Sequence, residues 1–323
     1  MAIMITGGTG FLGAYLARHL VQSKGCSGLV LFDRFPDERR IEEIVDQVHI
    51  VRGDVLEPQE ILEALDRYDV DRIVHLAFLT GNAREGKVLP YLRMQCMGTA
   101  NVFDAARIHG IKRVCSASSV AVYGAPVDRS LTEEDPARPV GLYGVSKLWS
   151  EGVAETYNRE YDMEIISLRV CASLGLGRLG RASHASGLIP PEEQAHFMAY
   201  PELAALGQPV TMPPDDQMTD FIYAADGAEV WWLALEAERP KHFVFNMRAE
   251  QRPVGDMTRH LRRLLPEAEI RIGTQPGLKM QLMDNTRLVS ELGFEPRYSL
   301  ETGLEDYVNR VRRRAGLPEV TPA

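Results

Sequence analysis

The first 170 residues of this chain of 323 alternate short apolar runs with amphipathic stretches, and this alternation constrains the fold more than any other feature. Short apolar runs predict buried strands, whereas apolar residues that repeat every three to four positions predict helices. Strands are expected at 2–6, 29–32, 48–51, 72–78, 112–119 and 164–170, and helices at 11–24, 61–68, 89–109 and 143–161. Apolar strands that alternate with helices indicate a parallel sheet with both faces covered.

Right-handed connections between such strands produce a doubly wound, Rossmann-type α/β fold, in which ligands bind at the carboxyl ends of the strands. The alternation stops after residue 170, and residues 173–220 are rich in glycine and proline. Further helices are expected at 226–238, 254–265, 286–292 and 300–314, and strands at 242–246 and 269–272. We therefore expect a sheet domain over residues 1–171, which carries the catalytic residues, and a smaller C-terminal α/β lobe over residues 172–323 that binds substrate, with some of its segments returning to the main sheet.

Composition and charge exclude several classes of partner. The chain carries 36 Lys and Arg against 45 Asp and Glu, a formal net charge of −9, which does not suit bulk contact with nucleic-acid phosphates. No apolar run approaches the roughly 20 residues of a membrane helix, and the first residues lack the pattern of a signal peptide. We expect no nucleic-acid or membrane partner and a cytoplasmic location. The four cysteines form no CxxC pair and the eight histidines no HExxH motif, so we expect reduced thiols and no metal site.

A glycine-rich loop lies between the first strand and the first helix. It reads Gly7-Gly8-Thr9-Gly10-Phe11-Leu12-Gly13. The missing side chains at Gly7, Gly10 and Gly13 would let the backbone approach a pyrophosphate, and the free amides at the start of the helix attract an anion. The strand–loop–helix order predicts a dinucleotide site that includes Phe11 and Leu12. As an isolated pattern, such a loop is more often only a turn.

An acidic residue follows at the end of the second strand. Asp33 lies 20 residues after Gly13, where an acid would accept hydrogen bonds from the adenosine ribose. A carboxylate there repels a 2′-phosphate, so NAD is favoured over NADP. The nearby Arg34, Arg39 and Arg40 weaken this preference, because any of them could neutralise such a phosphate. A capping or loop aspartate is the structural alternative.

The ends of the third and fourth strands supply further candidates for the cofactor site. Asp54 and Val55 follow the third strand, where they would meet the adenine, although Asp54 is as easily interpreted as a turn residue. His75, Leu76 and Ala77 end the fourth strand. We interpret His75 as a packed side chain, and Leu76 and Ala77 as residues that leave room for the cofactor.

A tyrosine and a lysine four residues apart form the candidate catalytic pair. Tyr143 and Lys147 would share one face of a helix. The fifth strand ends in Ser118 and Ser119, so a strand-end hydroxyl can meet this helix beside a nicotinamide. Alone, such a pair is common and often only exposed on a helix.

These motifs together make the chain resemble the extended short-chain dehydrogenase/reductase family, the NAD-dependent epimerase/dehydratase group. The resemblance covers nearly the whole chain and is carried by TGGTGFLG at 6–13, Asp33, GDV at 53–55, HLA at 75–77, GT at 98–99, Asn101-Val102, SSVAVYG at 118–124, YGVSK at 143–147, Leu168-Arg169, DFIYAAD at 220–226 and LGFEP at 292–296. It is specific for the family and much less so for a substrate.

The resemblance implies a role for each residue of the candidate catalytic group. Tyr143 would exchange a proton with a substrate hydroxyl while hydride moves to or from NAD, and Ser119 would fix the same oxygen. Ser119 is preferred over Ser118 because the family hydroxyl lies four residues before Tyr123. Lys147 would bind the nicotinamide ribose. Free tyrosine has a pKa near 10, so we expect the positive charges of Lys147 and of the oxidised nicotinamide to favour its anion.

Three departures from the family pattern bear on the substrate. Val120-Ala121 follow the catalytic serine where dehydratases carry an Asp–Glu pair, so we expect no dehydration. Thr219 stands where many nucleotide-sugar enzymes have an arginine that binds the diphosphate. Arg178, Arg181 and Arg287 are candidate replacements, and each is as easily a surface charge. Met97 replaces a family asparagine before Gly-Thr, which we expect to alter a buried hydrogen bond near the site.

Our leading expectation is an NAD-dependent oxidoreductase that interconverts a secondary alcohol and a ketone on a small hydroxylated molecule. The alternative is a sugar or nucleotide-sugar epimerase with tightly bound NAD, and a third class is a non-catalytic NAD-binding protein. The expected substrate-binding residues are Thr80, Asn82, Ser119, His184, Ser186 and Met218. A homodimer paired through helices 89–109 and 143–161 is also expected, unless those faces only cover the sheet.

Overall fold

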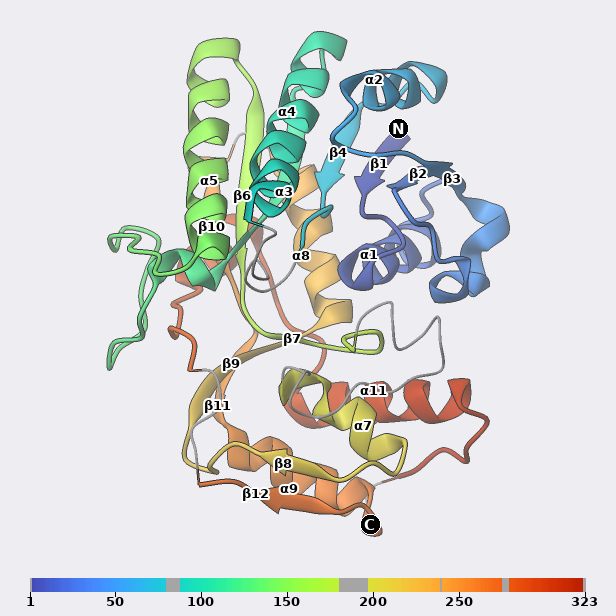
Figure 1. The fold of residues 1–323 in the computed structure, drawn as a ribbon, viewed down its shortest axis with the longest axis vertical. Helices are drawn as coiled ribbons and strands as arrows, with labels where there is room; N and C mark the ends of the chain where they lie inside the picture. Colours follow the sequence, from blue (N-terminus) through green and yellow to red (C-terminus); the bar gives the residue numbers. More distant parts are fainter. Residues whose placement is uncertain (1, 80–87, 180–196, 239, 275–278, 322–323) are drawn as a thin grey trace.

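The computed structural model describes residues 2–79, 88–179, 197–238, 240–274 and 279–321, and its centre is a parallel sheet of seven strands (Figure 1). In spatial order the strands are β10 (Val244–Met247), β6 (Glu164–Val170), β5 (Arg113–Ser119), β4 (Arg72–His75), β1 (Ala2–Thr6), β2 (Gly28–Asp33) and β3 (His49–Arg52). Every neighbouring pair is parallel. The architecture is the doubly wound α/β class that the alternation predicts.

The strand order changes direction at β1. Strands β2 and β3 lie on one side of it, and β4, β5 and β6 lie on the other. Thr6 at the end of β1 pairs with Phe32 in β2 and with His75 in β4. Open α/β sheets bind ligands in the crevice at such a switch point, so this register places the end of β1 and the end of β4 at the expected site.

Helices cover both faces of the sheet and enclose two cores. Helices α1 (Phe11–Gln22) and α8 (Ala224–Glu236) cover one face, and α2 (Pro58–Arg67), α4 (Gly98–His109) and α5 (Leu142–Tyr161) cover the other. Alternate residues of β2 face opposite ways, because Leu31 packs with α1 whereas Val30 and Phe32 pack with α2 and α4. The core under α1 and α8 continues without a break into the C-terminal part, where Trp231 and Tyr307 are fully buried.

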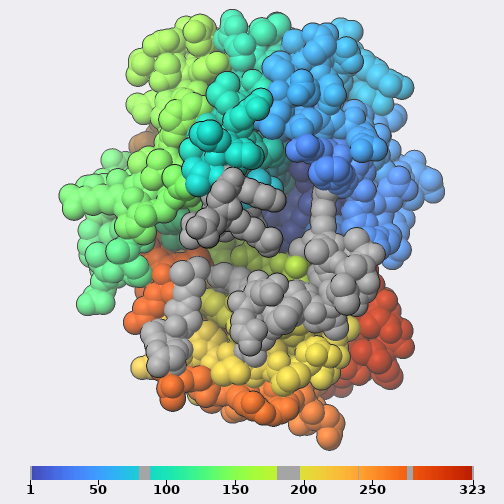
Figure 2. All heavy atoms as spheres, viewed as in Figure 1, coloured from blue at the N-terminus to red at the C-terminus, as the bar shows by residue number. Residues whose placement is uncertain are grey.

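The C-terminal part adds two small sheets and four helices to the described residues. The sheets are β11 (Glu250–Pro253), β9 (Met218–Tyr223) and β7 (Ser173–Leu174), and β12 (Ile270–Ile272) with β8 (Val210–Met212). The helices are α7 (Tyr200–Ala205), α9 (Val254–Leu264), α10 (Thr286–Leu292) and α11 (Leu300–Arg314). In the space-filling view the blue to green residues form the upper part of the molecule and the yellow to red residues the lower part (Figure 2).

The structure departs from the predicted elements in several places, since β4 ends at His75 rather than at residue 78 and β11 was not predicted. The helix expected at 89–109 consists of α3 (Val88–Leu92), a π-helical turn η3 (Arg93–Met97) and α4. The glycine- and proline-rich segment, expected to be irregular, contributes β7, α7, β8 and β9. The strand expected at 242–246 is β10, which extends the main sheet by pairing with β6. The division into domains at residue 171 stays a prediction. No helix among the described residues has the length and apolar character that crossing a membrane would require.

Candidate active site

The glycines let the loop pack tightly against its own backbone at the uncapped start of α1. Gly7 has φ +68°, and a Cβ at this position would lie 2.8 Å from the carbonyl oxygen of Leu76. A Cβ on Gly10 would lie 2.9 Å from the carbonyl oxygen of Gly7. Gly10 is the N-cap of α1 and offers no capping side chain, and the first turn of α1 contains no acidic residue. The amides of Phe11 and Leu12 therefore begin a helix with neither an internal acceptor nor a cap, which suits an anion.

Asp33 is held directly against the glycine loop. It is buried at the end of β2, and its Oδ2 accepts the amide of Thr9 at 3.2 Å and the hydroxyl of Thr9 at 2.8 Å. Its Oδ1 accepts the amide of Phe35 at 3.1 Å. These bonds fix the carboxylate at the place that a ribose-binding acid requires. The ribose contact itself stays a prediction.

Arg34 and Asp54, both expected at the adenosine end, pair with each other. Arg34 Nε lies 3.2 Å from Asp54 Oδ2, and Asp54 Oδ1 accepts the amide of Leu56 at 3.0 Å. The hydrogen bond from the Leu56 amide is typical of a turn, which was the alternative role expected for Asp54. Val55 is buried, and its carbonyl accepts Asn101 Nδ2 at 2.9 Å. Because Asp54 neutralises Arg34, the charge at this end does not favour a 2′-phosphate.

His75 is a packed side chain, as expected. Its Nδ1 lies 2.7 Å from Thr6 Oγ1 and its Nε2 lies 3.0 Å from Thr99 Oγ1. Burial lowers the pKa of His75 to about 3, so the ring is neutral and joins β1 to α4. Leu76 is buried beneath the glycine loop, and the amide of Ala77 donates to Thr6 Oγ1 at 3.3 Å.

The structure brings Ser119 and Tyr143 together. Ser119 is the last residue of β5, and Tyr143 is the second residue of α5. The Ser119 hydroxyl lies close enough to the Tyr143 phenol to lower the pKa of that phenol. Ser119 Oγ also accepts the amide of Ala121 at 3.2 Å, because Ser119 caps the short 3₁₀-helix η4 (Val120–Tyr123). The serine is thus oriented by its own turn before it meets the tyrosine.

Ser118 faces the opposite way, into a buried charge pair. Its Oγ donates to Glu151 Oε1. Arg169 binds both carboxylate oxygens of Glu151, at 2.9 Å and 2.8 Å, and also Tyr123 Oη at 2.8 Å. Sequence reasoning did not anticipate this pair, which joins β5 and β6 to α5 behind the Ser119–Tyr143 contact.

Lys147 is buried one turn along α5 from Tyr143. Its Nζ lies 4.1 Å from the ring centre of Phe78 and 5.7 Å from that of Tyr143. The rings of Phe78 and Tyr143 are 6.4 Å apart. No sequence motif marks Phe78, which follows HLA at 75–77, and the strand expected over 72–78 ends at His75.

The pKa values of the pair differ from expectation. Burial lowers the pKa of Lys147 to about 7 and raises that of Tyr143 to about 12, although the Ser119 hydrogen bond and the charge of Arg178 pull the tyrosine pKa downward. Lys147 is not among the charges that lower the Tyr143 pKa. Its ammonium lies over the ring of Phe78, and its effect on the Tyr143 anion stays a prediction. The anion of Tyr143 therefore needs a further positive charge, such as an oxidised nicotinamide.

The π-helical turn η3 places Gln95 toward the site. Gln95 is buried, whereas Met97, expected to affect a buried hydrogen bond, is 51 % exposed, so that expectation is wrong. Gln95 Oε1 accepts the amide of Leu79 at 2.9 Å, and its Nε2 donates to the carbonyl of Leu79 at 3.1 Å and to Tyr91 Oη at 3.3 Å. Helical spacing alone could not reveal this, because the π turn changes which side chains face inward.

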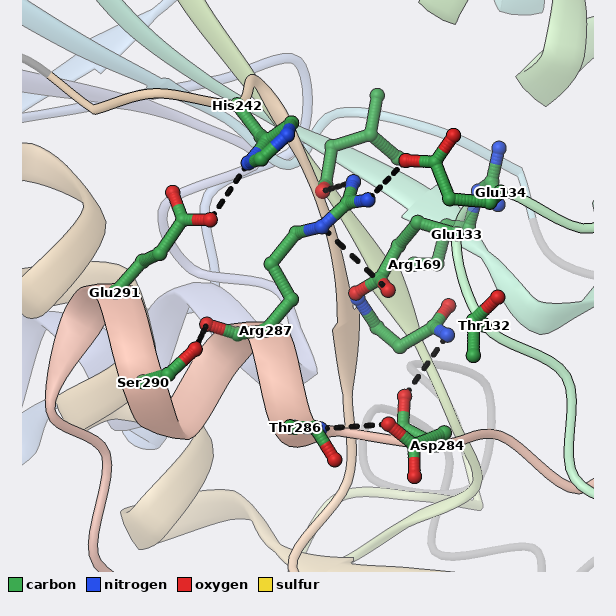
Figure 3. Close-up of polar contacts among 12 residues, drawn as sticks. Thr132, Glu133, Glu134, Arg169, His242, Asp284, Thr286, Arg287, Ser290 and Glu291 are labelled. Carbon is green, nitrogen blue, oxygen red and sulfur yellow. Dashed lines mark hydrogen bonds and ion pairs between the residues drawn. The ribbon is translucent and has the colours of Figure 1, made fainter.

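Of the three arginines that were candidates for binding a diphosphate, the two that the structure describes lie in different surroundings. Arg178 lies with its guanidinium carbon 5.6 Å from the ring centre of Phe11, and its charge also reaches Tyr143. Arg287 instead pairs with Glu134, approaches Glu133 at 3.7 Å and donates to a backbone carbonyl of β10 (Figure 3). Arg181 lies outside the described residues.

Several expected substrate-binding residues cannot be placed. Thr80, Asn82, His184 and Ser186 lie outside the described residues. Met218 is the first residue of β9 and is 44 % exposed. Its contact with substrate stays a prediction. No group of three or more metal-binding side chains occurs within the described ranges, and all four cysteines are free.

The arrangement fits a dinucleotide and a proton transfer. The glycine loop leads into an uncapped helix start, which suits a pyrophosphate, and Asp33 is hydrogen-bonded to that loop. Ser119, Tyr143 and Lys147 meet at the carboxyl ends of the adjoining strands. A hydroxyl, a phenol and an amine in this position can bind a substrate hydroxyl and move its proton.

The chain is similar to proteins of one family. The sequence model of the NAD dependent epimerase/dehydratase family matches residues 3–247. The chain is 28% identical to a UDP-glucose 4-epimerase of Azospirillum brasilense, over 72% of this chain and 68% of that protein. It is 26% identical to a UDP-glucose 4-epimerase of Corynebacterium glutamicum, over 95% and 94%.

Solved structures share the fold. A UDP-glucose 4-epimerase of Thermotoga maritima superposes with a TM-score of 0.82 at 20% identity, over 98% of this chain and 100% of that one. A UDP-glucuronic acid 4-epimerase of Bacillus cereus does so with a TM-score of 0.79 at 24% identity, over 97% and 100%. The names of the relatives favour the epimerase alternative over the net oxidoreductase that was the leading expectation.

Proposed function

The chain belongs to the NAD dependent epimerase/dehydratase family, and from that premise we propose that it is a nucleotide-sugar epimerase that inverts one secondary alcohol carbon and keeps its NAD bound. As a member of this family it is an NAD-dependent enzyme of the extended short-chain dehydrogenase/reductase type. The observation that carries the proposal is that the side chains of Ser119 and Tyr143 meet beside Lys147.

Each residue of this group would act on the substrate hydroxyl. Ser119 Oγ hydrogen-bonds the substrate oxygen and holds it next to Tyr143 Oη, which takes the hydroxyl proton and later returns it. NAD, when bound, supplies the site that accepts and gives back the hydride. Lys147 lies close enough to both Tyr143 and the end of β4 to hold a ribose hydroxyl while adding positive charge. Val120 and Ala121 offer no acid or base for removal of water.

The anionic part of the substrate needs a cation, and Arg178 suits this role. It is half-buried beside Phe11 at the start of α1, and no carboxylate pairs with it among the described residues. Thr219 lies in β9 and cannot replace the arginine that other family members have there. We assign Arg178 as a ligand of the nucleotide-sugar diphosphate.

Turnover of nucleotide sugars tests the proposed reaction. Purified protein is incubated with UDP-glucose, UDP-galactose and the corresponding uronic acids, and the sugar products are separated by chromatography while absorbance at 340 nm is recorded. We expect interconversion of epimers with no net change at 340 nm. Stoichiometric growth of that absorbance would contradict the proposal and restore the net dehydrogenase. Tyr143→Phe should lower kcat by about a hundredfold or more, since it removes the proton-transferring oxygen.

We also propose a homodimer and a cytoplasmic location. Helix α5 exposes apolar side chains along one side, with Val145 47 % and Trp149 39 % exposed, and Ile108 on α4 is 57 % exposed. Burying these side chains against a second copy would remove apolar surface from water. The free cysteines agree with a reducing compartment.

A further inference from the structure

The ammonium of Lys147 has an unusual environment. The side chain is only 5 % exposed, and it forms no hydrogen bond or ion pair with the residues that the structure describes. Its closest favourable partner is the face of the Phe78 ring, at 4.1 Å from Nζ to the ring centre. A cation within about 6 Å of a ring face is attracted by the ring quadrupole, most strongly where water is excluded.

Among the residues that the structure describes, no acidic side chain compensates this charge. The titratable groups that face Lys147 are Cys96 from η3, His75 from β4 and Tyr143 from its own helix. His75 is neutral, and both Cys96 and Tyr143 have pKa values raised by burial, so all three are uncharged at neutral pH. The ring of Phe78 is therefore the group that stabilises the protonated amine in this pocket.

The ring is itself held in place through the next residue. Gln95 accepts the amide of Leu79 and donates to its carbonyl, so both backbone groups of Leu79 are bound by a single side chain. Gln95 is in turn bound to Tyr91 Oη, one turn earlier in the same helical segment. This clamp fixes a segment that otherwise has no regular secondary structure after β4.

We propose that Phe78 is a positioning residue of the active site, whose ring holds the ammonium of Lys147 beside Tyr143, and that Gln95 fixes this ring by clamping Leu79. The catalytic consequence rests on the proposed function, because it requires that Lys147 takes part in the reaction. The effect on the amine itself does not depend on which substrate the enzyme uses.

The experiment follows the titration of Lys147 directly. The chain has six lysines, so protein carrying [13Cε]lysine gives few signals, and the spectrum of Lys147→Arg identifies the one from Lys147. The Cε shift is titrated in the full-length wild type, Phe78→Leu, Phe78→Tyr and Gln95→Met. Leucine keeps the pocket apolar but removes the ring face, so we expect the Lys147 pKa to fall by roughly 0.5–1.5 units. Tyrosine should retain the wild-type value, and Gln95→Met should shift it in the direction of Phe78→Leu.

A matched control comes from another cation over a ring. Arg67 lies 5.3 Å from the ring centre of Tyr68 at the end of α2, away from this pocket. Tyr68→Leu removes a similar pair and should leave the Lys147 titration unchanged. An unchanged pKa in Phe78→Leu would overturn the proposal. A rise would also overturn it, since it would show that the ring acts by keeping water out rather than by attracting the ammonium.

Activity provides a second readout once a substrate is found. A lower Lys147 pKa in Phe78→Leu means that this variant loses the protonated amine at lower pH than wild type does. The ratio of wild-type kcat to Phe78→Leu kcat should therefore grow about threefold to tenfold from pH 6 to pH 8. A shifted titration with no epimerase activity in the wild type would contradict the proposed function alone. An unshifted titration in an active enzyme would contradict the role of Phe78 alone.

Discussion

Two consecutive serines show how closely single residues determine this site. Ser119 meets Tyr143, whereas Ser118 binds the carboxylate of Glu151 on the other side of β5. Successive side chains of a strand face opposite ways, so a shift of one residue would exchange the two roles. The sequence favoured Ser119 only through the family resemblance, which places the catalytic hydroxyl four residues before Tyr123.

Other side chains could not be assigned without the fold. Sequence treats Arg178 and Arg287 alike, but Arg287 is neutralised by two glutamates that lie far away in the chain. Gln95 and Phe78 belong to no motif, and their importance depends on a contact across the turn after β4. Spacing rules identify residues that share one element, and they do not identify pairs that tertiary contacts create.

Replacing Arg178 tests the assignment of the anion site. Arg178→Ala should raise KM for a nucleotide sugar by roughly 10-fold to 100-fold, since it removes a charge-assisted contact worth about 1.5–3 kcal/mol. Binding of UDP, measured by calorimetry, should weaken in parallel. Arg159→Ala removes the same charge from an exposed site at the end of α5 and should change neither quantity. If Arg178→Ala weakens NAD binding and leaves the UDP affinity unchanged, Arg178 binds the cofactor and not the substrate diphosphate.

The buried amine of Lys147 should make stability depend on pH. Its pKa is about 7 in the fold and near 10.5 when unfolded, so the unfolded chain binds the extra proton between these values. The free energy of unfolding then rises with pH across this window, and below pH 7 the full penalty, at most about 5 kcal/mol, is present. Lys147→Met should therefore be more stable than wild type in urea unfolding at pH 6 and gain less at pH 9.5. A constant gain would contradict this, and activity should be lost at either pH.

At the scale of elements, the site depends on how α5 sits against the end of β5. The parallel strands and long helices were predictable, since apolar runs and helical repeats mark them. The π-helical turn and the short strands after residue 170 were not, because a π turn has no sequence period and β7, β8 and β9 gain their partners from distant segments. The placement of α5 is set by Glu151 with Arg169 and by a close backbone approach at Gly144.

Two glycines of α5 allow a test of whether the close contact at Gly144 sets the position of this helix. A Cβ on Gly144 would press on the carbonyl oxygen of Ala121 and lie 2.9 Å from Cβ of Pro139, whereas one on Gly152 would meet nothing within 4 Å. Gly144→Ala should destabilise the protein by about 1–3 kcal/mol and lower kcat, because it moves Tyr143 away from Ser119. Gly152→Ala should gain up to about 1 kcal/mol from helix propensity and keep its activity. Equal stability of the two variants in urea would contradict this view of α5.

At the scale of the whole molecule, the uncovered side of α5 points to a second copy. Trp149 and Val145 lie one turn apart and expose apolar surface, while the opposite side of the helix is buried on the sheet. Light scattering should give twice the 36.1 kDa chain mass. Trp149→Glu should give a particle of one chain mass, since two buried charges would face each other across a symmetric contact. Val289→Glu, an exposed change on α10, serves as control, and a monomeric wild type would contradict the dimer.

One edge strand of the main sheet, β10, is synthesised late. Val244–Met247 can pair with β6 only long after residue 170 has been synthesised. A nascent chain leaving the ribosome would thus display β6 as a bare edge while some seventy further residues are still being added, and bare edges recruit neighbouring polypeptides. Expression of a truncated gene ending before this strand should therefore yield inclusion bodies rather than an isolated cofactor-binding half.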